Sequence, residues 1–403
     1  MLAFNIGQTL LDLWQESGFS AFLLDGGWKN IVMLGIACVL LYLGIVKKFE
    51  PLLLVGIAFG CLLTNLPFGG LYHQELWTAF MDETSEYYHS YGRILAEGGL
   101  LDFLYIGVKT SIYPCLIFMG VGAMTDFGPM LSNPKSLLMG AGAQMGVFVA
   151  FFLAAISGAF TGPEAASISI IGGADGPTAI YTTSKLAPWL LGPIAIAAYS
   201  YMALIPMIQP PIMKMMTTPK ERKIVMVQTR EVSKAEKIIF PIVVTMFVAL
   251  LLPSTAPLIG CLMLGNLFRE CGVTARLSDT VQNALMNMIT IFLSTSVGAT
   301  MVASSFLTWQ TLLIVILGVF AFAFSTVGGL LVGKILCWAT KGKINPLIGS
   351  AGVSAVPMAA RVSQTVGQKY NPSNYLLMHA MGPNVAGVIG SAIAAGFLLS
   401  VFG

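Results

Sequence analysis

The chain has 403 residues, of which 56% are hydrophobic and 10% are charged, and its mean hydropathy is +0.82. This composition excludes an ordinary soluble enzyme and indicates a polytopic membrane protein. The net charge of +3 is small and no basic, aromatic-laced patch occurs, so no nucleic-acid partner is expected. The six cysteines stand singly and the three histidines lie far apart, which indicates small buried thiols rather than a transition-metal cluster.

The N-terminal segment, 1–30, carries no basic stretch ahead of the first apolar run, so a cleaved signal peptide is not expected. Within it, residues 9–25 are too polar to span a bilayer and predict an interfacial helix. The first membrane half, 31–213, includes a polar and mostly acidic loop at 67–102. The apolar segments of this half lie at about 31–46, 51–66, 103–125, 136–160 and 189–213.

A basic linker, 214–237, precedes the second membrane half, 238–403. Because loops rich in Lys and Arg stay on the cytoplasmic side, we expect this linker in the cytoplasm. Its seven cations outnumber Glu221, Glu231 and Glu236; they are Lys214, Lys220, Arg222, Lys223, Arg230, Lys234 and Lys237. The second half has apolar segments at about 238–253, 256–268, 285–306, 311–340 and 375–402. Together the apolar lengths predict about nine to eleven crossings.

Glycine and proline crowd around Asp175 in the interrupted segment 161–187, which contains TGPEAASISIIGGADGPTAIY. These residues break helices and free backbone groups, and at membrane depth a broken helix persists only inside protein or beside a cavity. No other charge occurs from Ala165 to Ser184, and an isolated carboxylate in a membrane segment indicates a functional site. Asp175 also suits the N-cap of a helix starting near Pro177, and both roles can coexist.

The second half has two interrupted segments of its own, 344–361 (INPLIGSAGVSAVPMAAR) and 379–396 (HAMGPNVAGVIGSAIAAG). Three stretches echo each other in the same order in both halves. They are IFMGVGAM (117–124) with IFLSTSVGAT (291–300), GVFVAFFLA (146–154) with GVFAFAFST (318–326), and DGPTAIY (175–181) with MGPNVAG (381–387). Paired interrupted helices in corresponding positions are typical of a transporter site where two repeats meet, although chance similarity between Gly/Ala-rich segments is the alternative. We therefore expect an all-α polytopic membrane protein of two repeated halves, inverted relative to one another if the crossing count allows it.

Several polar residues of the second half suit such a site. Asn345 precedes a proline, and Ser391 follows Asn384 by seven residues on the same helical face. Together with the Asp175 carboxylate and freed carbonyls, their oxygens are hard ligands that suit Na+. The alternative is that Asn and Ser serve as polar contacts between helices.

Two further residues, Tyr201 and Arg361, are candidates for proton transfer and for carboxylate binding. Tyr201 lies in the middle of an apolar segment, beside Tyr199, and is either a packing aromatic or a donor of a hydrogen bond or proton. Arg361 ends VPMAAR and lies seven residues after Ser354. It is either an interfacial charge or a bidentate partner for a carboxylate.

Long motifs resemble the beta subunit of the sodium-pumping biotin-dependent decarboxylases. They are KKFEPLLL (47–54), GVGAMTDFGP (120–129), GGADGPTAIY (172–181), AYSYMALIPMIQPPIMK (198–214), INPLIGSAGVSAVPMAAR (344–361) and HAMGPNVAGVIGSAIAAG (379–396). The resemblance covers nearly the whole chain from about residue 31, while 1–30 and 67–102 look divergent. It implies a multi-pass subunit of a bacterial or archaeal cell membrane, in contact with membrane lipids, that decarboxylates carboxybiotin, releases CO2 and exports Na+. A cytoplasmic alpha subunit with carboxyltransferase and biotin-carrier functions, a small gamma membrane subunit, trimers of beta subunits and an elevator-type movement are further implications.

The resemblance also assigns roles to residues. It implies that the sodium ligands are Asp175, Asn345, Asn384 and Ser391. It links Tyr201, Ser354 and Arg361 to proton transfer or carboxybiotin handling, and Gly349 to a position where the backbone is closely approached. The sequence does not determine which substrate donates the carboxyl group to biotin: oxaloacetate, methylmalonyl-CoA, glutaconyl-CoA or malonate. A Na+-coupled secondary transporter of a carboxylate, or a non-catalytic scaffold, are the alternatives.

Overall fold

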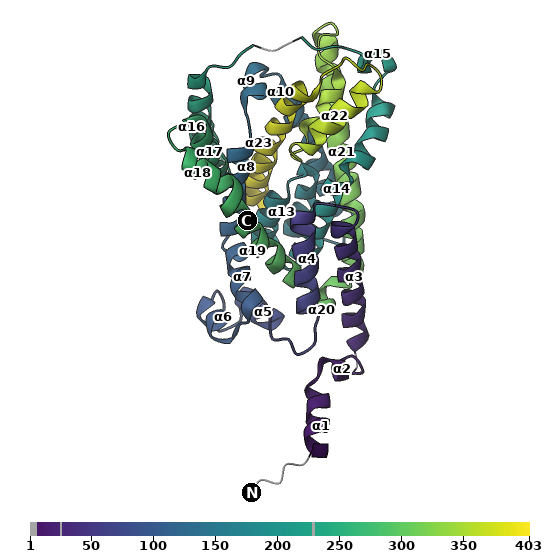
Figure 1. The fold of residues 1–403 in the computed structure, drawn as a ribbon, viewed down its shortest axis with the longest axis vertical. Helices are drawn as coiled ribbons and strands as arrows, with labels where there is room; N and C mark the ends of the chain where they lie inside the picture. Colours follow the sequence, from purple (N-terminus) through teal and green to yellow (C-terminus); the bar gives the residue numbers. More distant parts are fainter. Residues whose placement is uncertain (1–5, 25, 228–229) are drawn as a thin grey trace. The chain divides into compact units, whose positions relative to one another are not determined.

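A computed structural model describes residues 6–24, 26–227 and 230–403, and every regular element in these ranges is a helix (Figure 1). The described chain packs into two compact units. Unit 1 comprises Met1–Thr110 with Thr290–Thr311, and unit 2 comprises Ser111–Ile289 with Leu312–Gly403. These units differ from the predicted halves 31–213 and 238–403, because they follow packing whereas the halves follow repetition in the sequence. The repeat therefore stays a prediction.

Unit 1 is built on two apolar helices, α3 and α4, that lie side by side (Figure 1). Pro51 is the first residue of α4, where its missing N–H costs no intrahelical bond. The helices of unit 1 are α1 (Ile6–Glu16), α2 (Gly18–Ala21), α3 (Gly27–Ile45), α4 (Pro51–Thr64), α5 (Gln74–Met81), α6 (Tyr91–Glu97), α7 (Leu100–Lys109) and α20 (Ala303–Phe306). The predicted interfacial segment 9–25 thus lies mainly in α1 and α2, while residues 1–5 and residue 25 lie outside the described ranges. The residues of α19 (Met286–Ala299) and α21 (Trp309–Ala339) are divided between the two units.

The polar segment 67–102 is more ordered than a loop, because a fully buried carboxylate organises it. Asp102 accepts hydrogen bonds from the Trp77 indole at 2.7 Å, from the Gly99 N–H at 2.9 Å, and from both the N–H and the ring Nδ1 of His73. A buried charge of this kind is tolerated only when its oxygens are satisfied. Asp102 therefore holds α5 against the start of α7.

Unit 2 contains both interrupted segments that carry the predicted site residues. Its helices are α8 (Ile112–Met124), α9 (Gly128–Ser132), α10 (Ser136–Ala143), α11 (Met145–Ile156), α12 (Gly162–Ser169), η1 (Ile170–Gly173), α13 (Gly176–Leu186), η2 (Pro188–Leu190), α14 (Leu191–Met216), α15 (Pro219–Arg222), α16 (Lys234–Leu251), η3 (Pro253–Thr255), α17 (Ala256–Glu270), α18 (Ala275–Thr280), η4 (Val281–Leu285), η5 (Pro346–Gly352), α22 (Met358–Gln368) and α23 (Leu377–Phe402). In 161–187 the helix breaks between η1 and α13, where Ala174 takes a left-handed φ of 56°. In 344–361 the buried short helix η5 gives way to non-helical backbone before α22 begins.

The predicted interruption at 379–396 is not seen, because α23 runs without a break from Leu377 to Phe402. Pro383 lies near its start and removes one backbone hydrogen bond, which surrounding packing can offset in a buried helix. The glycines serve close packing instead of a break. A Cβ on Gly387 would overlap the carbonyl of Gly352, so only glycine lets α23 approach η5 this closely.

The described residues contain four helices that are long and apolar enough to span a membrane, or up to six if two bent pairs each count as one span. The apolar lengths predict nine to eleven crossings. The difference arises because several apolar segments fold as shorter helices, such as α4 with 14 residues. The structure nonetheless supports the prediction of an all-helical, multi-pass membrane protein.

The linker 214–237 is anchored at both ends, although residues 228–229 lie outside the described ranges. At one end, Arg222 is only 5% exposed and donates to the phenol oxygen of Tyr370 at 2.6 Å and to the carbonyls of Lys214 and Thr217 at the end of α14. At the other end, Arg230 donates a hydrogen bond to the Glu236 carboxylate at 2.8 Å. This bond, together with hydrogen bonds from Ser233, lowers the pKa of Glu236 to about 2. Charged side chains of the linker therefore hold its backbone in place, and its cytoplasmic side stays a prediction.

Candidate functional site

The Asp175 side chain lies at the break between η1 and α13 and is only 7% exposed. Asp175 is the N-cap residue of α13, and its Oδ1 accepts a hydrogen bond from the Thr178 N–H at 3.3 Å. The expected cap is therefore present. It occupies one carboxylate oxygen and leaves the other free to bind elsewhere.

The second oxygen of Asp175 is bound by a residue from a distant helix. Ser391 of α23 donates its hydroxyl to Asp175 Oδ2 at 2.8 Å, and Ser354 donates to the Ser391 hydroxyl at 3.1 Å. The Ser354 N–H also donates to the carbonyl of Gly173 at 3.2 Å. Three of the predicted site residues, Asp175, Ser354 and Ser391, thus form one connected chain between the two interrupted segments and α23.

A cavity of about 100 Å³ lies beside Asp175 and Ser354, with apolar walls that include Phe118, Met202 and Val388. Its volume is a few times the roughly 30 Å³ that a water molecule occupies in the liquid. Sites for organic ligands are typically larger, about 300–1,000 Å³. The space beside the carboxylate therefore suits a small ion and not an organic acid.

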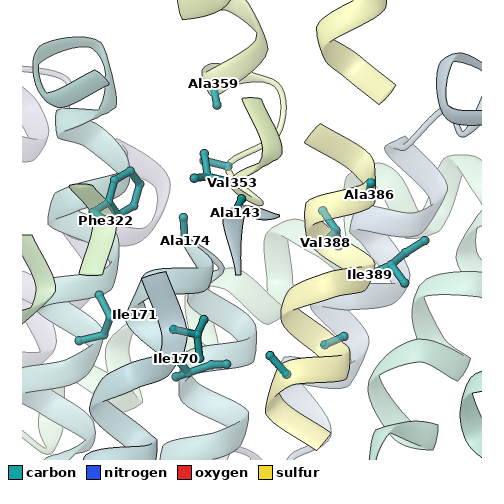
Figure 2. Packing of buried hydrophobic residues seen from close by; sticks show 14 of the residues in the cluster. Ala143, Ile170, Ile171, Ala174, Phe322, Val353, Ala359, Ala386, Val388 and Ile389 are labelled. Atoms are coloured by element: carbon teal, nitrogen blue, oxygen red, sulfur yellow. The ribbon is translucent and has the colours of Figure 1, made fainter. Parts of the chain in front are cut away.

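Apolar residues from four separate segments pack around this site. Figure 2 shows Ala143, Ala174, Val353 and Val388 within one buried cluster. Because these side chains are small, the backbones that carry them come close together and exclude solvent from the carboxylate. In such surroundings a charge on Asp175 needs a partner, which Ser391 supplies only in part.

Asn384 lies on the same helix as Ser391 and contacts the same neighbouring segment. Its amide nitrogen donates to the carbonyls of Ala351 at 2.9 Å and Val353 at 2.7 Å, and no described residue donates to its buried Oδ1. The amide nitrogen thus holds the backbone just before Ser354, while the oxygen is a candidate ligand for a cation.

The structure does not join Asn345 to the Asp175 network. The Asn345 amide donates to the carbonyls of Arg222 and Ile224, and its oxygen accepts from the Leu347 N–H at 3.0 Å. All its polar atoms are engaged with the linker and with the start of η5. Gly349 lies within η5, where a Cβ would overlap the carbonyl of Gly329 on α21, so close backbone approach requires glycine.

Tyr201 and Arg361 also lie outside the carboxylate network. The buried Tyr201 hydroxyl donates to the Val315 carbonyl of α21, whereas Tyr199 packs its ring against Gly176, next to Asp175. Arg361 is exposed on α22, and within the described ranges no residue forms a salt bridge or side-chain hydrogen bond with its guanidinium. Its five donors are therefore available to an external ligand.

One residue of this site was missed in the sequence. Gln144 lies between α10 and α11, is 6% exposed, and donates to the carbonyl of Gly387 on α23 at 3.4 Å. It is the only polar side chain from Leu137 to Ile156, which is the sequence feature that could have found it.

Comparisons with known proteins identify the family. Residues 29–402 match the family model of the Na+-transporting oxaloacetate decarboxylase beta subunit. The chain is 62% identical to methylmalonyl-CoA decarboxylase subunit beta of Propionigenium modestum, covering 98% of this chain and 100% of the relative. It is 58% identical to glutaconyl-CoA decarboxylase subunit beta of Acidaminococcus fermentans, with 98% of each chain covered. It is 54% identical to oxaloacetate decarboxylase beta chain 2 of Salmonella typhi, covering 93% of this chain and 95% of the relative. The resemblance found in the motifs is thus confirmed, and the chain belongs to the family of Na+-transporting oxaloacetate decarboxylase beta subunits.

Proposed function

We propose that this chain is a membrane subunit that decarboxylates carboxybiotin and couples this reaction to the export of Na+. One observation carries the ion-binding part. A buried carboxylate, Asp175, lies at a helix break beside a cavity of ion size and shares a hydrogen-bonded chain with Ser391 and Ser354. Hard oxygen donors in a small space suit a hard cation.

The Asp175 carboxylate can alternate between two partners. When ionised it binds Na+, and when protonated it is neutral. Because burial disfavours an unpaired charge, the carboxylate without Na+ is expected to take up a proton. The Ser391 hydroxyl also lies 3.0 Å from the Val388 carbonyl. It can therefore turn its proton to that carbonyl and offer a lone pair to a cation beside Asp175.

The chemistry supplies both a proton sink and a source of free energy. When carboxybiotin loses CO2, the bond from the ureido nitrogen to the carboxyl carbon breaks, and the nitrogen takes up a proton. Moving each Na+ outward against about 100 mV costs about 2.3 kcal/mol from the potential alone. An exergonic reaction must drive this step, and loss of CO2 is the source we propose.

Arg361, Ser354, Gly349 and Tyr201 are proposed to handle the carboxyl group and the proton. Arg361 is exposed and unpaired among described residues, and its planar fork matches a carboxylate. Ser354 lies at the Asp175 cavity, and the backbone is closely approached at Gly349. Tyr201, whose hydroxyl donates to the Val315 carbonyl, is proposed to relay the proton. Asn345 is proposed as a further sodium ligand, which requires it to leave its hydrogen bonds to the linker. Biotin itself would be brought by the partner alpha subunit.

The proposals for the partner subunits and for the carboxylic substrate rest on membership of the family. We propose an alpha carboxyltransferase and biotin-carrier subunit, a small gamma subunit, a trimer of beta subunits and an elevator-type movement of the ion site in a prokaryotic cell membrane. The relatives named above take their names from three different substrates, oxaloacetate, methylmalonyl-CoA and glutaconyl-CoA. The choice among them is proposed to belong to the alpha subunit.

The test is Asp175→Asn in the purified complex and in proteoliposomes. The change keeps the shape and the capping oxygen but removes the charge, so Na+ uptake and Na+-dependent decarboxylation should both be lost while the protein still inserts. The variant Asp82→Asn, at an exposed acid of unit 1, is the control. Retained Na+-dependent turnover in Asp175→Asn would refute the ion-site assignment. Na+ movement that requires a carboxylate co-solute and no biotin would instead favour the secondary transporter.

A further inference from the structure

Gln144 stands at the junction of the elements that carry Asp175 and Ser391. It separates α10 from α11, and these two helices pack against α23 and η1 respectively. The glycines beside it permit this. A Cβ on Gly140 would overlap the backbone of Ala386, and a Cβ on Gly172 would overlap the backbone of Gly146.

The nitrogen and the oxygen of the Gln144 amide differ in their hydrogen bonding. Its nitrogen donates to the carbonyls of Gly140 and Gly387, each at 3.4 Å. Its oxygen is buried, and no described residue donates a hydrogen bond to it. Because the nitrogen is held by two carbonyls, the oxygen is fixed on the opposite side of the amide.

That oxygen lies close to the Asp175 network. A Cβ built on Gly173 would lie 3.7 Å from Gln144 Oε1 and 3.0 Å from the Cβ of Ser391. The oxygen and the Ser391 side chain therefore approach the same point on η1, two residues before Asp175. On α23 the Gln144 amide also lies across Gly390, the residue immediately before Ser391.

A purely structural role accounts for only half of this arrangement. The nitrogen alone is enough to tie α10 to α23, through the carbonyls of Gly140 and Gly387, and this leaves the buried side-chain oxygen without a donor. Such an oxygen is costly to bury unless something binds it. A cation beside Asp175 would satisfy it, because an amide oxygen is a hard ligand.

We propose that Gln144 supplies a further side-chain oxygen to the cation site at Asp175 and Ser391. The inference rests on the proposed function, since it deepens the same ion site. Gln144 is then a cation-binding residue from a third element, and it ties α10 and α11 to the occupancy of the site.

The experiment measures Na+ binding by thermal melting of the purified complex, with choline chloride keeping the ionic strength constant. A ligand that binds only the folded state stabilises it by RT ln(1 + [L]/Kd), so the Na+ concentration needed for a given rise in melting temperature scales with the Kd. Gln144→Met has nearly the same length without the oxygen. It should raise the Na+ concentration needed for a fixed rise in melting temperature by about tenfold, the effect of one lost oxygen contact. If this variant does not accumulate, Gln144→Asn, which retracts the oxygen by one methylene, should show the same shift.

Asn65→Leu is the matched control. Asn65 is a buried amide of unit 1 whose nitrogen donates to Met301 and whose oxygen accepts from Ala303. Its loss should lower the melting temperature without changing the Na+ concentration needed for the fixed rise. Variants of Gln144 that melt at a lower temperature but need no more Na+ than wild type for the fixed rise overturn the inference. An Asp175→Asn variant that keeps its Na+ response overturns the proposed function instead, so the two failures are distinguishable.

Discussion

The Ser391 hydroxyl donates a hydrogen bond of 2.8 Å to Asp175 Oδ2, across a sequence separation of 216 residues. This bond joins the interrupted segment that ends at α13 to the continuous helix α23. A hydrogen bond to an ionised partner is stronger than a neutral one, so it holds the carboxylate oriented towards the cavity. The site is therefore assembled by tertiary packing, and each side chain in it can be tested separately.

Ser391→Ala removes this hydroxyl. The loss of a charge-assisted hydrogen bond and of one oxygen ligand should cost roughly 1.5–3 kcal/mol of ion binding. The Na+ concentration for half-maximal decarboxylation should rise by about tenfold or more. The control is Ser400→Ala on the same helix, whose hydroxyl bonds to the Gly396 carbonyl. Reduced activity in Ser391→Ala with an unchanged Na+ midpoint would indicate a packing role.

Arg361→Lys should reduce the rate of carboxybiotin decarboxylation more than it reduces Na+ binding. Arginine presents a planar pair of donors to a carboxylate, whereas lysine offers a point charge. Because Arg361 is exposed, the melting temperature should stay within about one degree of wild type. The comparison is Arg276→Lys, at another exposed arginine of unit 2. Equal losses of rate and of Na+ affinity would argue against a specific role in binding the carboxyl group.

Tyr201→Phe removes only a buried hydroxyl that donates to the Val315 carbonyl. If the phenol relays a proton, the maximal rate should fall several-fold and its dependence on pH should change. Tyr181→Phe provides a matched control, since the Tyr181 hydroxyl also donates to a backbone carbonyl, that of Ser254, at 3.4 Å. If both variants lose about 1 kcal/mol of stability and keep the wild-type pH profile, Tyr201 is structural.

Asp102→Asn should destabilise unit 1. The carboxylate accepts from His73, Trp77 and Gly99, and an amide would turn its own N–H groups towards some of these donors. We expect the free energy of unfolding, measured with denaturant, to fall by roughly 2–4 kcal/mol. The Na+ concentration for half-maximal decarboxylation by the folded protein should not change. A variant as stable as wild type would show that the buried carboxylate contributes no net stability.

A cysteine introduced at Val227, which is 85% exposed, reports on the side of the membrane. The excess of Lys and Arg in 214–237 predicts the cytoplasm. The cysteine should therefore resist an impermeant thiol reagent in intact cells and react after permeabilisation, with the parent chain as the background. Labelling from outside in intact cells would reverse the proposed orientation and with it the direction of Na+ transport.

The break at Asp175 follows from the sequence because its causes are local. Glycine frees the backbone, Pro177 suits the first turn of α13, and the carboxylate caps that turn, so the order of these residues is sufficient to end one helix and start another. The same local rules failed at Pro383. There the packing of α23 against η5 and α10 maintains a continuous helix through a proline that the sequence alone interprets as an interruption.

The partners of the site residues were decided only by tertiary structure. Asp175, Ser354 and Ser391 converge, whereas Asn345 turns to the linker and Arg361 stays exposed, although all five lie in motifs of similar character. Sequence spacing determines which face of a helix a residue occupies, but not which distant helix covers that face. That choice depends on where glycines such as Gly173 and Gly387 let backbones meet, and on which buried oxygens then need a partner.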